Sequence, residues 1–391
     1  MERLAFLFLL VPVLGAAEDR LDAIHALLVA RRTAPIAEGR GATGALTDVK
    51  HQLRDWIEFH LSDVQWKDGR RTPNLIVLQE QLNDGLSKAD LFCPQNTDCE
   101  QNPLGYLGRI AFEIQSGYLV VRTSIGIQIC GTDDSAYIYE WADDRWRRIW
   151  QSEQSNYEEE TFSPQRLVDV RISPTDWRPE SDHTEHLIVT AGVLPWCTSV
   201  WQPIYYRVWQ TKSTFAEARL LLDEKEQADI AAPIYVRVSR NDVFIEFHVI
   251  AADAMRVPEF LHYFIENRKL RRTDPVALTP QNFVSFWLLH PWTEVSEWTA
   301  QASRGVLKRW REGYNGTNSE FTAPTRHCTA HTDLWQVATD AGGDLHGGVH
   351  YFLMRARPPF RFTMVAASDR PWPDCTEDDP AIDKAPDLFE K

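Results

Sequence analysis

A chain of 391 residues can form two or three ordinary domains or one large repeat domain, and its 43% of hydrophobic residues are ample for a sizeable core. The formal net charge of -15 argues against nucleic acids and anionic membrane surfaces as partners, because phosphate contacts need clustered Lys and Arg side chains.

The N-terminus has the pattern of a secretory signal peptide over residues 1–17. A charged head, Met1–Arg3, precedes the apolar run Leu4–Leu14 and the small residues Gly15–Ala17, after which we expect cleavage. The alternative is a membrane anchor, but the run is too short to cross a bilayer comfortably. We therefore predict an exported protein, periplasmic or extracellular, with no membrane span after signal cleavage.

Residues 18–90 are predicted to form a helical N-terminal segment. Apolar residues recur at helical spacing in Leu21–Leu28, in Asp48–Leu61 and again after Pro73. Between the first two stretches, Ala34–Ala45 contains a proline and three glycines, which is typical of a linker.

One segment of the chain recurs. Leu119–Trp141 and Leu187–Trp209 each begin with a strand-like apolar run, cross a loop that holds a Cys and end on a Tyr-rich alternating run. Two weaker copies are Phe244–His262 and a pair of runs, Leu334–Val337 and Tyr351–Arg355. With the short strands that flank it, each unit supplies about four antiparallel strands, and this pattern resembles that of β-propellers in general.

The predicted fold is therefore mainly β, with a propeller-like antiparallel repeat domain over residues 108–375. A helical insertion is expected at about residues 279–313, because Thr279 can cap a helix whose first residue is Pro280. Residues 376–391 are acidic and lack aliphatic periodicity, so we expect a disordered acidic tail there.

The cysteines indicate disulfides. An even number of six in an exported chain suggests three bridges, although six cysteines allow 15 pairings. No CxxC pair is present, which disfavours a zinc site. The disulfide candidates are Cys93, Cys99, Cys130, Cys197, Cys328 and Cys375.

Four histidines form the best candidate for a metal site. His327 and His331 are four residues apart, as are His346 and His350, so each pair can point the same way and hold one ion. The competing interpretation is four surface histidines near a disulfide. Apart from this possible metal ion, the sequence predicts no cofactor.

The loops of the repeat are the candidate ligand-binding site. The first copy carries Asp133 and Asp134, and the matching loop of the second carries Trp196 and Trp201. Adjacent carboxylates point to opposite sides of an extended chain, which makes the two acids a poor catalytic pair. Aromatic rings beside acids and hydroxyls suit sugars, whereas the alternative for the two tryptophans is packing in the core.

Three functions compete on these observations. The motifs GxSxG, HExxH, GxxxxGK and GxGxxG are absent, which removes the simplest enzyme classes. The first hypothesis is an exported non-enzymatic β-repeat protein that binds an extracellular glycan or peptide through loops on one edge. The second is a secreted hydrolase that uses carboxylates or a His-bound metal, and the third is a structural cell-envelope component. An extracellular polymer or protein is the expected partner.

Overall fold

The computed structural model describes residues 20–30, 39–62, 73–93, 105–128, 131–154, 166–175, 185–194, 201–211, 218–250, 256–266, 269–273, 276–313, 319–321, 323–341, 348–357 and 361–383. The chain divides into two compact units, Met1–Glu226 and Gln227–Lys391. We refer to them as the first unit and the second unit.

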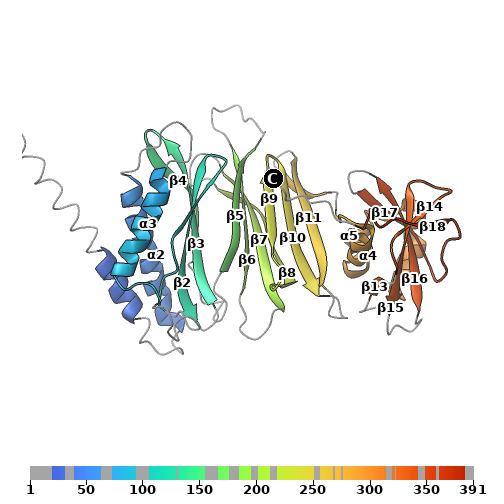
Figure 1. Cartoon of the computed structure of the whole chain (residues 1–391), viewed down its shortest axis with the longest axis horizontal. Coiled ribbons are helices and arrows are strands. Elements are labelled where there is room, and N and C mark those ends of the chain that lie inside the picture. Colours follow the sequence, from blue (N-terminus) through green and yellow to red (C-terminus); the bar gives the residue numbers. More distant parts are fainter. Residues whose placement is uncertain are drawn as a thin grey trace, which may run out of the picture. The chain divides into compact units, whose positions relative to one another are not determined.

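The described strands form four antiparallel sheets, which confirms the prediction of a mainly β fold (Figure 1). The first sheet contains β1 (Ala111–Gln115), β2 (Tyr118–Gln128), β3 (Gly131–Ala142) and β4 (Arg145–Ser152). The second contains β5 (Arg166–Pro174), β6 (His186–Val193), β7 (Trp201–Thr211) and β8 (Arg219–Asp229). The third contains β9 (Tyr235–Ser239), β10 (Asp242–Ile250), β11 (Arg256–Glu266) and β12 (Lys269–Arg272). The fourth contains β13 (Ser319–Phe321), β14 (Arg326–Cys328), β15 (Leu334–Ala341), β16 (Val349–Arg357), β17 (Arg361–Ser368) and β18 (Cys375–Asp378).

The repeat predicted from the sequence corresponds to the central hairpins of these sheets. The four copies coincide with the antiparallel pairs β2–β3, β6–β7, β10–β11 and β15–β16. The expected hairpin after the first copy is also present, since β3 and β4 pair around Asp143 and Asp144, whose φ angles are 51° and 57°. Left-handed residues at both central positions are what a tight hairpin turn requires.

The helical N-terminal segment is present, but its linker is shorter than predicted. Residues 20–30 are helical, α2 spans Gly39–Leu61 and α3 spans Pro73–Lys88. Helix α2 therefore begins inside the stretch Ala34–Ala45 that the glycines had marked as a linker. Each glycine costs a helix about 1 kcal/mol relative to alanine, a cost that tertiary packing of the remaining helix can override.

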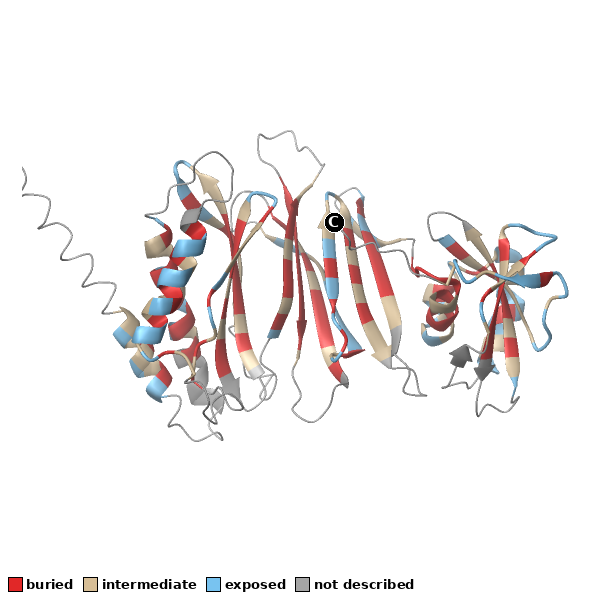
Figure 2. Ribbon diagram, in the orientation of Figure 1, coloured by how far each residue is buried: buried red, intermediate tan, exposed pale blue. Residues whose placement is uncertain are grey.

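The first sheet is covered on both faces. On one face, Leu53 and Trp56 of α2 are buried in one cluster with Val121 of β2. Figure 2 shows that buried residues occur both along the N-terminal helices and along the strands of the sheet. On the other face, Val120 of the first sheet shares a cluster with Val170 of the second. Alternate residues of β2 thus enter two different cores, as the period of a strand requires.

The helical insertion lies in the second unit, as predicted. It contains α4 (Pro280–Leu289), α5 (Trp292–Val295), a short 3₁₀ turn and α6 (Arg304–Glu312). Thr279 caps α4 by accepting a hydrogen bond from the Asn282 N–H at 3.1 Å, and Pro280 occupies the first turn. Trp287 is fully buried in a cluster with Phe352 and other residues of the fourth sheet.

The end of the chain is more ordered than predicted. The expected disordered tail was to begin at residue 376, yet β18 (Cys375–Asp378) pairs with β14. Beyond the strand, Asp383 accepts a hydrogen bond from the Thr325 N–H at 2.9 Å. The acidic residues have donors on β14 and on the segment before it, so their charge does not keep this stretch from folding. Residues 384–391 lie outside the described residues.

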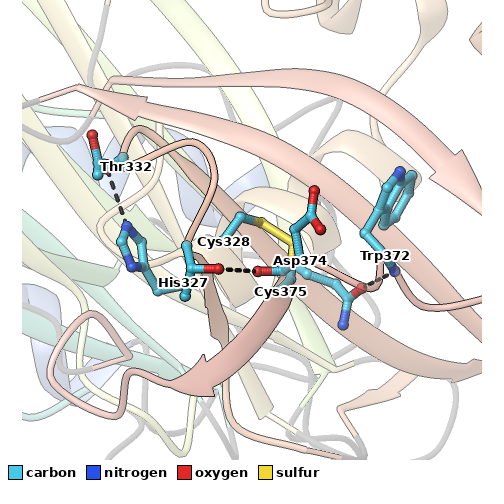
Figure 3. The surroundings of a disulfide bond; sticks show 8 residues. His327, Cys328, Thr332, Trp372, Asp374 and Cys375 are labelled. Carbon is cyan, nitrogen blue, oxygen red and sulfur yellow. Dashed lines mark hydrogen bonds between the residues drawn. A yellow bond between two sulfur atoms is a disulfide. The ribbon is translucent and has the colours of Figure 1, made fainter.

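One predicted disulfide is described in full. Cys328 and Cys375 are joined and connect β14 to β18 (Figure 3). Cys93 is also disulfide-bonded, while Cys99, Cys130 and Cys197 lie outside the described residues. Because disulfides persist in oxidising compartments, the bond supports the prediction of an exported protein.

Two further predictions concern membranes. Among the described helices, none has the length and apolarity needed to cross a bilayer. The predicted signal peptide, residues 1–17, lies outside the described part of the chain.

Candidate functional site

The structure does not place the predicted acids of the first copy on a ligand-binding loop. Asp133 and Asp134 lie within β3, because the strand already begins at Gly131. Asp133 is fully buried and forms an ion pair with Lys50 of α2, whose Nζ also donates to the Gln154 carbonyl oxygen at 2.8 Å. A carboxylate enclosed beneath a helix cannot contact an external ligand, so the loop prediction for this residue is wrong.

Asp134 points to the opposite side of the strand. Its Oδ2 accepts a hydrogen bond from the Leu167 N–H of β5 at 2.8 Å. Burial raises the pKa of Asp134 to about 6, against the lowering effect of hydrogen bonds from Thr132 and Leu167. The two neighbouring carboxylates therefore serve two different contacts, one with the helices and one with the second sheet.

The polar cluster beneath α2 extends beyond these residues. Arg54 donates to Glu153 at 3.0 and 3.1 Å, and the Tyr137 hydroxyl donates to the same carboxylate at 2.7 Å. Burial raises the pKa of Tyr137 well above its usual value. The described side chains of this cluster are covered by α2, so it joins the helix to the first sheet and is closed to a substrate.

The two predicted tryptophans give no test of the ligand site. Trp196 lies outside the described residues, and Trp201 begins β7, with its side chain also outside the described part. A stacking role for both stays a prediction.

The predicted metal-binding histidines have separate surroundings. His327 Nε2 lies 3.2 Å from a main-chain carbonyl oxygen, and His331 is exposed in a turn. His350 is buried, and its Nδ1 lies 2.8 Å from Asp369. His346 lies outside the described residues. Within the described part of the chain, no three His, Cys, Asp or Glu side chains are grouped closely enough to hold a metal ion.

The structure instead brings together a carboxylate–arginine cluster that the sequence interpretation missed. Arg171 of β5 contacts Glu113 of β1 through Nη1 at 3.1 Å and Asp169 through Nε at 2.9 Å. Arg122 of β2 contacts Asp169 at 3.0 Å and lies 3.8 Å from Glu113. Two carboxylates from two sheets therefore meet at the same two guanidinium groups. We call these four residues the Glu113–Asp169 cluster.

The two carboxylates differ in exposure. The Asp169 side chain is 10% exposed and also accepts a hydrogen bond from the Val170 N–H at 2.9 Å, so three donors fix its orientation. The Glu113 side chain is 43% exposed, and its partners among the described residues are both arginines. One carboxylate is thus held rigidly, while the other is open to solvent.

The cluster is positioned by the contact between β1 and β5. Gln115 is buried between these strands, donates to the Val170 carbonyl oxygen at 2.9 Å and accepts from the Ile172 N–H at 3.1 Å. This side chain links two strands that lie in different sheets, so it fixes the distance across which Glu113 and Arg171 meet.

A groove adjoins the cluster on the same edge strand. Its volume is about 230 Å³, below the roughly 300–1,000 Å³ of typical small-molecule sites, and it opens to solvent. Glu113 belongs both to the groove wall and to the cluster. The other residues that line it are Leu75, Ile76, Gln79, Phe112, Ile114 and Leu119. The groove therefore offers an aromatic ring and an amide on an otherwise apolar surface, and at its edge the Glu113 carboxylate is turned to the other face of β1, toward Arg171.

A second charged cluster lies in the second unit. His290 has Glu259 at 2.7 Å from Nε2 and Glu294 at 3.2 Å from Nδ1, and Glu294 also pairs with Arg272. Burial alone would lower the pKa of His290, but hydrogen bonds to both glutamates outweigh it and raise the pKa to about 9. Both ring nitrogens are occupied, so this cluster attaches the end of α4 to the third sheet and leaves no atom of the imidazole for a substrate.

A sequence signal for the Glu113–Asp169 cluster existed. In the run Val168–Ile172, Asp169 and Arg171 are two residues apart and point to the same face of a strand. Charged residues on a face that packs against another sheet need partners of opposite charge. The partner Glu113 is 58 residues from Arg171, a separation that the sequence alone does not bridge.

Comparison with known proteins gives a weak likeness to enzymes. No family model and no curated protein matches the sequence. Among solved structures, the chain is similar to the GH93 α-L-arabinofuranosidase of Fusarium graminearum in complex with arabinobiose, with 10% identity, a TM-score of 0.29 and coverage of 72% of this chain and 70% of that one. It is also similar to the catalytic domain of the GH62 α-L-arabinofuranosidase of Coprinopsis cinerea, with 10% identity, a TM-score of 0.18 and coverage of 70% and 93%.

The proteins in these matches are glycosidases, which contradicts the first hypothesis from the sequence. The prediction of a non-enzymatic glycan- or peptide-binding protein is therefore wrong. A likeness at these TM-scores assigns no role to any residue.

Proposed function

We propose that the protein is a hydrolase of glycosidic bonds that uses Glu113 and Asp169 as its pair of carboxylates. The observation that carries the proposal is their meeting at Arg171, 3.1 and 2.9 Å from its nitrogens, where Glu113 also forms part of a solvent-open groove. Two carboxyl groups that flank the scissile bond are the usual requirement for this reaction.

The different surroundings of the two carboxylates favour different roles. Glu113, exposed at the groove, transfers a proton to the oxygen of the leaving group as the glycosidic C–O bond breaks. Asp169, fixed by three donors, attacks the sugar carbon or takes a proton from the attacking water. A fixed position is favourable for this second role, because a small displacement of the attacking group has a large effect on rate.

The groove suits a sugar substrate. Phe112 offers an aromatic ring for the apolar face of a sugar, and the Gln79 amide offers polar contacts for hydroxyl groups. The substrate class that we propose is an extracellular polysaccharide, consistent with an exported protein whose net charge of -15 disfavours nucleic acids. The protein would act in the periplasm or outside the cell.

Hydrolysis assays test the proposal. The purified full chain is incubated with a panel of 4-nitrophenyl glycosides, including the α-L-arabinofuranoside suggested by the matching enzymes, and with plant and bacterial polysaccharides followed by reducing-end detection. We expect activity on at least one substrate, and a loss of at least a hundredfold in kcat for Glu113→Gln and for Asp169→Asn.

Asp223→Asn provides the matched control. Asp223 lies in the same unit and pairs with Arg207 at 2.9 Å, so its loss removes an exposed ion pair of similar geometry away from the groove. It should retain the activity of the unmodified protein. Absence of hydrolysis across the panel, or equal rates for Glu113→Gln and Asp223→Asn, would refute the proposal.

A further inference from the structure

A pocket in the second unit has no part in the proposed reaction. It lies on the fourth sheet, where β14, β15 and β16 are neighbours, and its volume is about 140 Å³. The small side chain of Ala338 leaves room at its base. Polar walls come from Arg326, Gln336 and Tyr351, and Pro324 and Val349 add apolar surface.

A buried amide faces this pocket. Gln336 is 1% exposed, and its Oε1 accepts the Trp372 N–H at 2.7 Å. That bond fixes which end of the amide is the oxygen, and the NH₂ group therefore lies at the other end. The structure gives this NH₂ group no acceptor among the described residues. An occupant of the pocket that carries an oxygen atom can therefore accept a hydrogen bond from it.

A second polar group of the pocket has no protein partner either. The Tyr351 hydroxyl forms no hydrogen bond with any of the described residues, and it can both donate and accept. Ala338 and Tyr351 are directly paired across β15 and β16, so the hydroxyl and the space left by the alanine are adjacent.

The disulfide makes the pocket rigid. Cys328 follows Arg326 on β14 and is joined to Cys375, whose N–H donates to the Trp372 carbonyl oxygen at 3.1 Å. The N–H of that same tryptophan holds Gln336. The covalent bond thus fixes the segment that orients the amide, which favours a preformed site.

The charge of the pocket selects against anions. Arg326 is its only charged lining residue among those described, and its Nε is paired with Asp378 at 3.1 Å. The guanidinium charge is therefore balanced, while its other N–H groups remain donors for a neutral acceptor. A ligand with several hydroxyl groups matches these donors and the two-way hydrogen bonding of Tyr351.

We propose that this pocket binds one neutral sugar residue, separately from the hydrolytic site. The choice of a sugar over another polyhydroxy compound rests on the proposed function, whereas the pocket and its donors do not. In a protein that cleaves a polysaccharide, such a pocket would hold a second part of the same chain.

Binding to the full chain tests this assignment. L-arabinose, D-xylose, D-galactose and D-glucose are titrated separately, with saturation-transfer NMR to detect contact and calorimetry to measure Kd. Ala338→Leu fills the base of the pocket and should raise the Kd of the bound sugar at least tenfold. Tyr351→Phe removes a single oxygen atom, preserves the packing and should raise Kd about fivefold, the value of one hydrogen bond.

The controls separate this inference from the proposed function. Asp223→Asn, which alters neither the groove nor this pocket, should bind the sugar as the unmodified protein does. The assignment is overturned if the unmodified protein binds none of the sugars, if Tyr351→Phe and a correctly folded Ala338→Leu both bind normally, or if acetate or phosphate displaces the sugar. None of these outcomes depends on whether hydrolysis is observed.

Discussion

The buried ion pair between α2 and the first sheet allows a quantitative prediction. Lys50 and Asp133 are 2% and 0% exposed, so each charge has lost nearly all its water. Replacing Lys50 by Met keeps the volume of the side chain but leaves the Asp133 carboxylate buried without its cation. Breaking a buried pair from one side costs about 3–5 kcal/mol, and we expect a loss of that size in the free energy of unfolding.

A double-mutant cycle isolates the interaction. Lys50→Met combined with Asp133→Leu removes both charges, so the double variant should regain most of the stability that either single variant loses. Arg147→Met is the matched control, because Arg147 pairs with Glu140 on the same sheet but is 42% exposed, and such pairs contribute about 0–1 kcal/mol. Urea unfolding of the full chain, followed by fluorescence and circular dichroism, gives the free energies. A loss for Lys50→Met no larger than that for Arg147→Met would refute the reasoning.

Three further predictions concern stability. The pKa of His290 is raised from 6.5 to about 9, so the contribution of His290 to folding stability is complete below pH 6.5 and is lost as pH rises through 9. The midpoint temperature of thermal unfolding should fall over this pH range, and His290→Gln should make the fall smaller. The pKa of Asp134 is raised from 3.8 to about 6, so folding stability is lost as pH rises through 6. Asp134→Asn should therefore stabilise the protein by up to about 3 kcal/mol at pH 7 and leave its stability unchanged below pH 3.8. Equal effects of the substitution at the two pH values would contradict the burial argument. Replacing Cys328 and Cys375 by Ala opens a loop with a sequence separation of 47 and should cost about 4 kcal/mol, measured by urea unfolding against the oxidised unmodified protein.

The sequence predicted the sheets better than the contacts between them. The recurring segment marks the central hairpin of each sheet, because a hairpin is local and its alternation is visible in consecutive residues. The run after Cys130 was assigned to a loop because Thr132, Asp133, Asp134 and Ser135 are all polar. It forms a strand because each carboxylate finds a partner, Lys50 on one side and a backbone N–H on the other.

The candidate site shows the same limit more strongly. Glu113 and Arg171 are 58 residues apart, and nothing in either short run identifies the other. What the sequence does contain is a pair of opposite charges, Asp169 and Arg171, inside an apolar strand. Such charges require partners when the strand is packed on both faces, which marks the position as unusual without naming what it contacts.

Arg171 provides the observation that separates a catalytic pair from a structural network. Its guanidinium touches both carboxylates but is 39% exposed, so as a purely structural ion pair it should contribute at most about 1 kcal/mol to stability. If Glu113 and Asp169 carry out hydrolysis, Arg171→Met should instead lower kcat more than it changes KM. A structural network predicts no such loss, so an Arg171→Met variant with an unchanged kcat would show that the reaction takes place elsewhere.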